Sequence, residues 1–260
     1  MKTRVLVTGA SRGIGRAICL QLARQGAEIA ACASDHADEL ATLVTEASQL
    51  GGRVLPLTGD LADPATPERL VAQTLSGLGG LDAVVSNAGV SRPSSLVNLS
   101  LQDWDYLMAV NARAPWLLAK ASFPALRESR GSFVSVASMS GVQPYPGMGA
   151  YSPSKAAVLM LVRTLAQEWA TCGIRVNAVS PGLIHTTLTA KVYADAPTKA
   201  AREALVPLHR IGNAEADIAG LVAFLIGPEA GYITGQNLLA DGGLLDSVQS
   251  LIPGRPASER

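Results

Sequence analysis

The stretch Val5-Leu6-Val7-Thr8-Gly9-Ala10-Ser11-Arg12-Gly13-Ile14-Gly15 runs from a short apolar segment through three glycines into a helical pattern. Gly9 permits a tight turn, Gly13 lets the backbone approach a phosphate, and Gly15 lets the helix pack closely on the strand. The spacing is Gly-x-x-x-Gly-x-Gly rather than the common Gly-x-Gly-x-x-Gly. Such a turn between a strand and a helix is where the pyrophosphate of a dinucleotide can rest. The stretch therefore predicts an α/β fold that begins with a nucleotide-binding turn.

Short apolar runs of strand length alternate with amphipathic stretches along the rest of the chain. These runs are continuous, as is typical of strands that are covered on both faces. They span residues 5–8, 28–33, 53–57, 83–86, 132–137, 175–180 and 237–240. Helical patterns lie between them, for example at 15–25, 38–50, 67–78 and 104–119. This alternation predicts a doubly wound parallel sheet with right-handed crossovers.

Proline and glycine mark the ends of elements and form no linker, so residues 1–260 are predicted to be one domain. Two irregular zones, 91–99 and 186–212, each follow a predicted strand. Ligands of open parallel sheets bind beyond the carboxyl ends of the strands. We therefore expect the polar, alanine-rich zone at 186–212 to be a lid insertion. Residues from about 247 onward hold two prolines and little periodicity, which predicts a tail.

Composition narrows the classes of function. Lys+Arg and Asp+Glu both total 21, so the formal net charge is zero, which favours neither nucleic acid nor a membrane surface as a partner. The chain has 3 cysteines and 3 histidines, dispersed without metal-ligand spacing. The cysteine usage predicts a reduced protein, the N-terminus runs into a strand without a secretory signal, and no stretch is apolar enough to span a bilayer. We expect a cytoplasmic protein without a metal.

The segment Tyr151-Ser152-Pro153-Ser154-Lys155 carries the chemistry. A phenol and an ammonium four residues apart share one face of a helix. The lysine charge is expected to favour the phenolate and lower the tyrosine pKa from its usual value of about 10. Pro153 is compatible with a helix only in its first turn, which predicts a helix start at this place. Ser138, just past the run 132–137, is placed to hold a substrate oxygen near Tyr151.

Two later strand ends also suit a nucleotide. Asp60 ends the third apolar run, where its carboxylate can accept from an adenine amino group. Asp63 has the alternative role of capping the next helix. The small residues Asn87-Ala88-Gly89 end the fourth run and let the backbone lie against a flat ligand.

These motifs together resemble the short-chain dehydrogenase/reductase family, in its single-domain form of about this length. The resemblance runs from the glycine turn through Asn111 and Ser138 to Ser180-Pro181-Gly182 and Asp241-Gly242-Gly243. It implies a Rossmann-like sheet of seven strands in the order 3-2-1-4-5-6-7, a homotetramer, and a hydride transfer between a nicotinamide and a carbonyl or secondary alcohol. The catalytic residues that it implies are Asn111, Ser138, Tyr151 and Lys155. The implied cofactor site comprises Gly9, Ser11, Arg12, Gly13, Ile14, Gly15, Ser34, Asp60, Leu61, Asn87, Ala88, Gly89, Tyr151, Lys155, Pro181, Gly182, Ile184 and Thr186.

The end of the second run bears on the choice of dinucleotide. An acidic residue there binds a ribose 2′-hydroxyl and repels a 2′-phosphate, but this chain has Ala33 at that position. Arg12 can grip a 2′-phosphate and Ser34 can donate to it. Asp35 lies one or two residues beyond and leaves NAD(H) open. The sequence favours NADP(H).

The sequence specifies the substrate less closely than the reaction. The loops after the fourth and fifth runs, with part of residues 188–207 in the expected lid, supply mostly apolar candidates, which suit an uncharged or weakly polar carbonyl compound. The residues that we expect around the substrate are Ser138, Gln143, Tyr145, Met148 and Tyr151, with Pro93, Ser94, Met139 and Pro144 nearby. One alternative is a 3-oxoacyl-(acyl-carrier-protein) reductase, for which Arg127 and Arg130 supply basic charge although Cys172 replaces a basic residue usual in that branch. An alternative of another class is a non-catalytic dinucleotide-binding sensor or scaffold.

Overall fold

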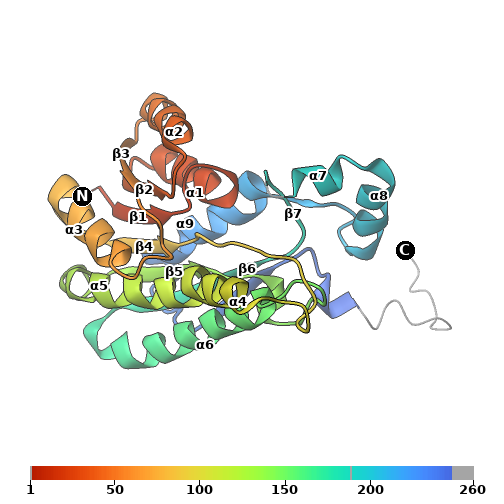
Figure 1. The fold of residues 1–260 in the computed structure, drawn as a ribbon. Helices are drawn as coiled ribbons and strands as arrows, with labels where there is room; N and C mark the ends of the chain where they lie inside the picture. Colours follow the sequence, from red (N-terminus) through yellow and green to blue (C-terminus); the bar gives the residue numbers. More distant parts are fainter. Residues whose placement is uncertain (1, 188, 248–260) are drawn as a thin grey trace.

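Seven parallel strands form the central sheet of the computed structural model, which describes residues 2–187 and 189–247 (Figure 1). The order is β3-β2-β1-β4-β5-β6-β9, so the predicted order is confirmed, with β9 as the seventh strand of the sheet. The strands are β1 (Arg4–Thr8), β2 (Glu28–Ala33), β3 (Arg53–Thr58), β4 (Ala83–Ser86), β5 (Ser132–Val136), β6 (Arg175–Pro181) and β9 (Asn237–Ala240). Each predicted run lies on a strand within one residue at either end.

Two helical layers cover the sheet, and alternate residues of each strand pack against one layer or the other. In β1, Val5 and Val7 belong to the core cluster on the side of α1, α2 and α9, whereas Leu6 belongs to the cluster on the side of α3, α5 and α6. All three side chains are fully buried. Burial on both faces explains why the strands read as continuous apolar runs.

The helices follow the predicted alternation. They are α1 (Gly13–Arg24), α2 (Ala37–Gln49), α3 (Thr66–Leu78), α4 (Leu101–Met108), α5 (Ala114–Ser129), α6 (Tyr151–Trp169), α7 (Ala190–Tyr193), α8 (Ala196–Leu205) and α9 (Gly220–Ile226). The predicted single helix at 104–119 is wrong in detail, because a π-helical turn, Ala109–Arg113, separates α4 from α5. One widened turn leaves the apolar periodicity on either side intact, so the sequence pattern does not reveal it.

Helices α7 and α8 lie within the zone 186–212 and project outside the two helical layers, at the right of Figure 1. The short strands β7 (Ile184–His185) and β8 (Gly212–Asn213) pair in parallel where the chain leaves and rejoins the main body. This small second sheet was not predicted, because two-residue strands carry too little pattern. The predicted tail, apart from Ser247, lies outside the described residues.

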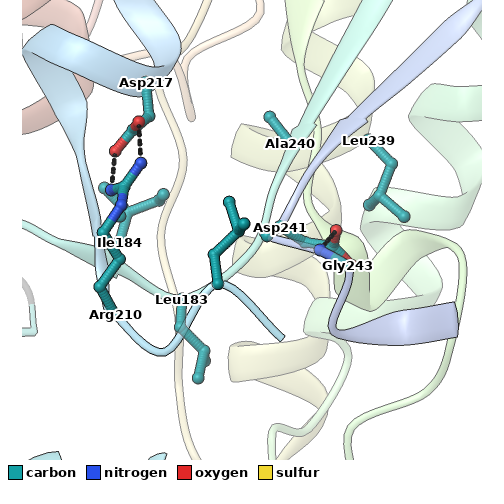
Figure 2. Close-up of a pocket in the computed structure, with 11 residues that line it drawn as sticks. Leu183, Ile184, Arg210, Asp217, Leu239, Ala240, Asp241 and Gly243 are labelled. Carbon is teal, nitrogen blue, oxygen red and sulfur yellow. Dashed lines mark hydrogen bonds and ion pairs between the residues drawn. The ribbon is translucent and has the colours of Figure 1, made fainter. Parts of the chain in front are cut away.

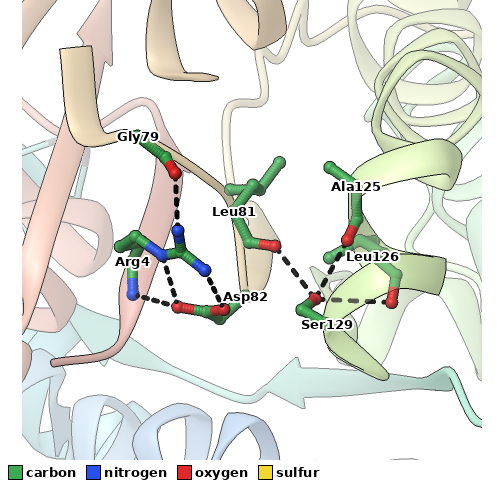
Figure 3. A network of polar contacts seen from close by, with 7 residues as sticks. All are labelled: Arg4, Gly79, Leu81, Asp82, Ala125, Leu126 and Ser129. Atoms are coloured by element: carbon green, nitrogen blue, oxygen red, sulfur yellow. Dashed lines mark hydrogen bonds and ion pairs between the residues drawn. The ribbon is translucent and has the colours of Figure 1, made fainter. Parts of the chain in front are cut away.

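An ion-paired network ties the start of β1 to the start of β4 (Figure 3). The Arg4 guanidinium donates through Nε and Nη2 to the two carboxylate oxygens of Asp82 at 2.9 and 2.8 Å, and through Nη1 to the Gly79 carbonyl at 2.7 Å. Burial opposes ionisation of Asp82, but the hydrogen bonds from Arg4 outweigh it and hold its pKa below the usual value. Ser129, at the end of α5, donates to the Leu81 carbonyl at 3.0 Å. These contacts fix the amino edge of the sheet, opposite the edge where ligands bind.

Among residues 2–187 and 189–247, no helix is long and apolar enough to cross a bilayer. The same residues contain no group of three or more His, Cys, Asp or Glu side chains arranged to hold a metal ion.

Candidate active site

Helix α6 begins at Tyr151, directly at the carboxyl edge of the sheet. Pro153 is its third residue and needs no intrahelical amide partner there. The predicted helix start is therefore confirmed. The spacing of four residues places Tyr151 and Lys155 on the same face of the first turn.

Lys155 is almost fully buried, with 4% of its surface exposed. Its Nζ donates to the Val136 carbonyl at 3.0 Å and lies 5.8 Å from the centre of the Tyr151 ring. Burial lowers the pKa of Lys155 from 10.5 to about 8. The ammonium is thus charged near neutral pH but held in a place that disfavours its charge.

The Tyr151 phenol lies beside Ser138, which follows β5 and is itself buried. Burial raises the pKa of Tyr151, and its hydrogen bond with the Ser138 hydroxyl lowers it by less. The expectation of a lowered pKa is therefore wrong for this structure, because the sequence could not show that burial of the phenol would outweigh its hydrogen bond with Ser138. A raised pKa keeps the proton on Tyr151 at neutral pH, so the group that faces a substrate is the phenol and not the phenolate.

Asn111 lies in the π-helical turn and is buried, with 1% of its surface exposed. Its Oδ1 accepts from the Val90 amide at 2.8 Å, and its Nδ2 donates to the Val90 carbonyl at 2.9 Å and to the Ser154 hydroxyl at 3.1 Å. Asn111 therefore joins the segment after β4 to the first turn of α6. Val90 and Ser154 were not singled out from the sequence, since neither side chain carries a recognisable chemical signal.

The glycine turn has the tight geometry that its sequence predicts. Gly9 and Gly13 have φ angles of +63° and +57°, and a β-carbon on Gly15 would lie 2.1 Å from the Gly9 carbonyl oxygen. Helix α1 begins at Gly13 and has no acidic residue in its first turn. The backbone there is open to a ligand and its partial positive charge is not neutralised, so the turn suits a phosphate.

Thr8 and Asn87 hold this turn in place. The Thr8 hydroxyl accepts from the amides of Asn87 and Ala88 at 3.1 and 3.2 Å. The Asn87 side chain donates to the carbonyls of Thr8 and Gly9 at 2.9 and 3.1 Å. Asn87 thus acts through the backbone of the turn, and Thr8 is a supporting residue that the sequence reasoning overlooked.

Other predicted cofactor residues lie around the same edge. A β-carbon on Gly89 would lie 3.3 Å from Lys155 Nζ, and one on Gly13 would lie 3.6 Å from the β-carbon of Thr186. The amide of Gly182 donates to the Ala240 carbonyl at 2.9 Å, which fixes the end of β6. The predicted residues Ser11, Leu61, Pro181 and Ile184 are buried, whereas Ile14 is partly exposed. The structure thus brings the glycine turn, the end of β4 and the segment after β6 to one edge.

At the end of β2, the Ser34 hydroxyl donates to the Asp35 carboxylate at 2.8 Å, and both residues are exposed. The exposed Arg12 side chain makes no hydrogen bond or ion pair with the residues that the structure describes. Asp60 is exposed and accepts from the Ala62 amide at 2.9 Å, while Asp63 accepts from the Ala65 amide at 3.0 Å, just before α3. Arg12 and Asp60 thus present charged groups that ligands can reach.

The two loops expected around the substrate lie against each other. Ser94 and Met148 form a parallel bridge, with the Ser94 amide donating to the Gly147 carbonyl at 2.9 Å. Gln143 and Tyr145 are exposed, and Met148 is partly exposed. The Tyr145 amide donates to the Ser152 hydroxyl at 3.2 Å, so this loop is also tied to the first turn of α6.

A cavity of about 500 Å³ lies on another side of the segment after β6 (Figure 2). Arg210 and Asp217 form a bidentate ion pair on one wall, with both N–O distances at 2.7 Å, and Leu239 and Asp241 lie on the wall opposite. None of the four predicted catalytic residues lines this cavity. Ile184, one of the predicted cofactor residues, does line it, so the cavity lies next to the predicted cofactor site.

The chain is similar to known oxidoreductases over nearly its whole length. A family model described as enoyl-(acyl carrier protein) reductase matches residues 9–245. A 3-oxoacyl-(acyl-carrier-protein) reductase of Thermotoga maritima is 38% identical over 92% of this chain and 96% of the relative. A glucose 1-dehydrogenase of Gluconobacter oxydans is 38% identical over 93% of this chain and 91% of the relative.

Among solved structures, a short-chain dehydrogenase from Burkholderia cenocepacia J2315 in complex with NADP is 37% identical, with a TM-score of 0.86. The match covers 94% of this chain and 98% of that one. The matches in sequence and in fold agree, and the chain belongs to the short-chain dehydrogenase/reductase family.

Proposed function

We propose that this protein is an NADP(H)-dependent oxidoreductase that interconverts a small carbonyl compound and its secondary alcohol. The observation that carries the proposal is the meeting of Tyr151, Ser138 and Lys155 at the sheet edge that also holds the glycine turn. Tyr151 can donate a proton and Ser138 can hold a substrate oxygen by a hydrogen bond. The glycine turn beside them suits a dinucleotide phosphate.

In the direction of reduction, Tyr151 donates its proton to the carbonyl oxygen as negative charge develops there. Ser138 donates a hydrogen bond to the same oxygen and holds it beside the phenol. A bound NADPH supplies the hydride. Lys155 stabilises the phenolate that remains, because its charge lies close to the ring in a poorly solvated place. In the direction of oxidation, the same phenolate removes the hydroxyl proton.

The preference for NADP(H) is supported by Arg12, whose guanidinium is exposed next to the glycine turn and has no protein partner among the described residues. A guanidinium binds a phosphate with paired, charge-assisted hydrogen bonds. The Burkholderia relative in complex with NADP agrees with this preference. Asp35 keeps NAD(H) as the second cofactor to be tested.

Reduction of 3-oxoacyl groups on a carrier protein is the second candidate, supported by the Thermotoga relative. Arg130 lies beside Gly173, with its Cγ 3.3 Å from a β-carbon placed there. However, Arg130 precedes β5 whereas Ser138 follows it, and five strand residues span roughly 16 Å. Within one chain the basic residues lie at the edge opposite Tyr151, so a carrier bound at Arg130 would have to serve the site of a second subunit.

Self-association is part of the proposal. Trp116 on α5 and Met160 on α6 are 47% and 58% exposed, which is unusual for large apolar side chains that contact no partner. A homotetramer that covers these helices accounts for both. Sedimentation at several protein concentrations tests it, and a monomer at all concentrations would refute it.

The proposed activity is tested by following NADPH absorbance with a panel of small ketones and sugars and with a 3-oxoacyl thioester. Turnover of a small carbonyl compound, faster with NADPH than with NADH, supports the first candidate. Turnover of the thioester alone supports the second. Tight NADPH binding without turnover of any compound would support a non-catalytic sensor or scaffold.

A further inference from the structure

The first turn of α6 carries both Tyr151 and Lys155, yet no conventional cap fixes it. The residue before the helix is Ala150, which has no side chain able to cap the amide groups. Pro153 contributes no amide hydrogen to this turn. Some other contact has to set the position of the helix start, since a catalytic phenol displaced by about 1 Å loses much of its effect.

Ser154 makes that contact from inside the helix. It is fully buried, and its hydroxyl donates to the Tyr151 carbonyl at 2.7 Å while accepting from Asn111 Nδ2 at 3.1 Å. The hydroxyl thus joins the backbone of Tyr151 to a side chain 43 residues earlier. Because the bridge is buried, water cannot replace either hydrogen bond at low cost.

The far end of this bridge reaches the proposed cofactor wall. Asn111 holds both the amide and the carbonyl of Val90, and Val90 follows Gly89. A β-carbon on Gly89 would lie 3.3 Å from Lys155 Nζ and 3.5 Å from Asn111 Oδ1. The segment after β4, the π-helical turn and the first turn of α6 therefore form one hydrogen-bonded unit around Lys155.

We propose that Ser154 is a positioning residue, which through Asn111 fixes Tyr151 and Lys155 relative to the bound dinucleotide. This inference rests on the proposed function, because the positions it fixes are those of the proposed proton donor and its lysine. Ser154 is fully buried, so neither substrate nor cofactor is expected to contact it. Its effect is to hold the backbone of Tyr151, and with it the phenol, in place beside Ser138.

The test compares Ser154→Ala and Ser154→Cys with the wild-type protein. Alanine removes the hydroxyl, and cysteine fills the same space with a weak hydrogen-bonding group. Both variants are expected to lower kcat at least tenfold while leaving the NADPH dissociation constant within about threefold. A matched control is Thr45→Ala, which removes an exposed hydroxyl on α2 that donates to the Ala41 carbonyl at 3.2 Å, and which should leave kcat unchanged.

A second readout does not depend on turnover. The ultraviolet difference between each protein and its Tyr151→Phe counterpart isolates the titration of one phenol. Loss of the bridge should let water reach Tyr151 and move its pKa down toward the ordinary value of about 10. If wild-type turnover is not found, the proposed function fails, and this titration still tests the positioning role.

Two results would overturn the inference. One is a Ser154→Cys variant in which kcat and the Tyr151 pKa equal the wild-type values. That result would show that Ser154 only fills space. The other is an effect of Ser154→Ala that adds fully to that of Asn111→Ala, since residues that act through one bridge should be non-additive.

Discussion

Replacing Lys155 by methionine is expected to abolish carbonyl reduction and, at the same time, to stabilise the fold near neutral pH. Lys155 is buried and charged, and its only hydrogen bond among the residues described is to the Val136 carbonyl at 3.0 Å. A buried ammonium without a carboxylate partner destabilises the folded state. Methionine has a similar length and carries no charge.

The magnitude follows from the pKa of Lys155, which burial lowers from 10.5 to about 8. Each pH unit corresponds to about 1.4 kcal/mol, so the charged form destabilises the fold by roughly 3 kcal/mol at pH 7. Loss of the hydrogen bond to Val136 offsets about 1 kcal/mol of this. The variant should therefore be more stable than the wild-type protein by about 2 kcal/mol at pH 7.

The pH dependence of stability is a second test of whether Lys155→Met stabilises the fold. Between pH 8 and 10.5 the unfolded chain binds the lysine proton and the folded chain does not, so wild-type stability rises with pH in this window. The penalty is fully present below pH 8 and is lost above 10.5. The advantage of Lys155→Met should therefore shrink to nearly zero by about pH 9.5.

Urea unfolding at pH 7 and pH 9.5, at one protein concentration and with unchanged m-values, measures both quantities. Lys191→Met, which removes an exposed lysine from α7, is the control and should change stability by less than about 0.5 kcal/mol at either pH. A Lys155→Met variant less stable than the wild-type protein at pH 7, or an advantage that does not shrink at pH 9.5, would show that the buried charge of Lys155 does not destabilise the fold.

Two further predictions concern the cofactor site. Gly15→Ala places a β-carbon 2.1 Å from the Gly9 carbonyl oxygen, so it should lower the unfolding free energy by about 2 kcal/mol or more and weaken NADPH binding at least tenfold. Gly220→Ala is the control, because a β-carbon there meets nothing within 4 Å, and calorimetry with fluorescence titration checks both variants. Arg12→Ala should weaken NADPH binding at least tenfold and NADH binding less than twofold, as measured by fluorescence titration, because only NADPH carries the 2′-phosphate; equal weakening of both cofactors would contradict the assignment of Arg12.

The sheet was predictable because its strands are buried on both faces. Residues such as Val5, Leu6 and Val7 have to be apolar in succession, which leaves short continuous apolar runs of strand length. The glycine turn was predictable for a similar reason, since Gly15 leaves no room for a β-carbon. Elements whose packing permits only one kind of residue can therefore be predicted from the sequence.

Features that depend on long-range contacts were not predictable in the same way. The π-helical turn that holds Asn111 changes the helical register by one residue, and Ser154 looks like any helical serine until its two partners are known. The pKa of Tyr151 depends on the balance between burial and its hydrogen bond with Ser138. The charge on Lys155 was visible in the sequence, whereas the burial that opposes phenol ionisation was not.

The most direct test of the account is the turnover of Tyr151→Phe, which removes one hydroxyl and leaves the ring in place. With NADPH and a ketone that the wild-type protein reduces, we expect this variant to bind NADPH with a dissociation constant within about threefold of wild type. We also expect a kcat lower by about a thousandfold or more, because the proton donor is lost. A variant that keeps kcat within tenfold of the wild-type value would contradict the assignment of Tyr151 as the catalytic acid.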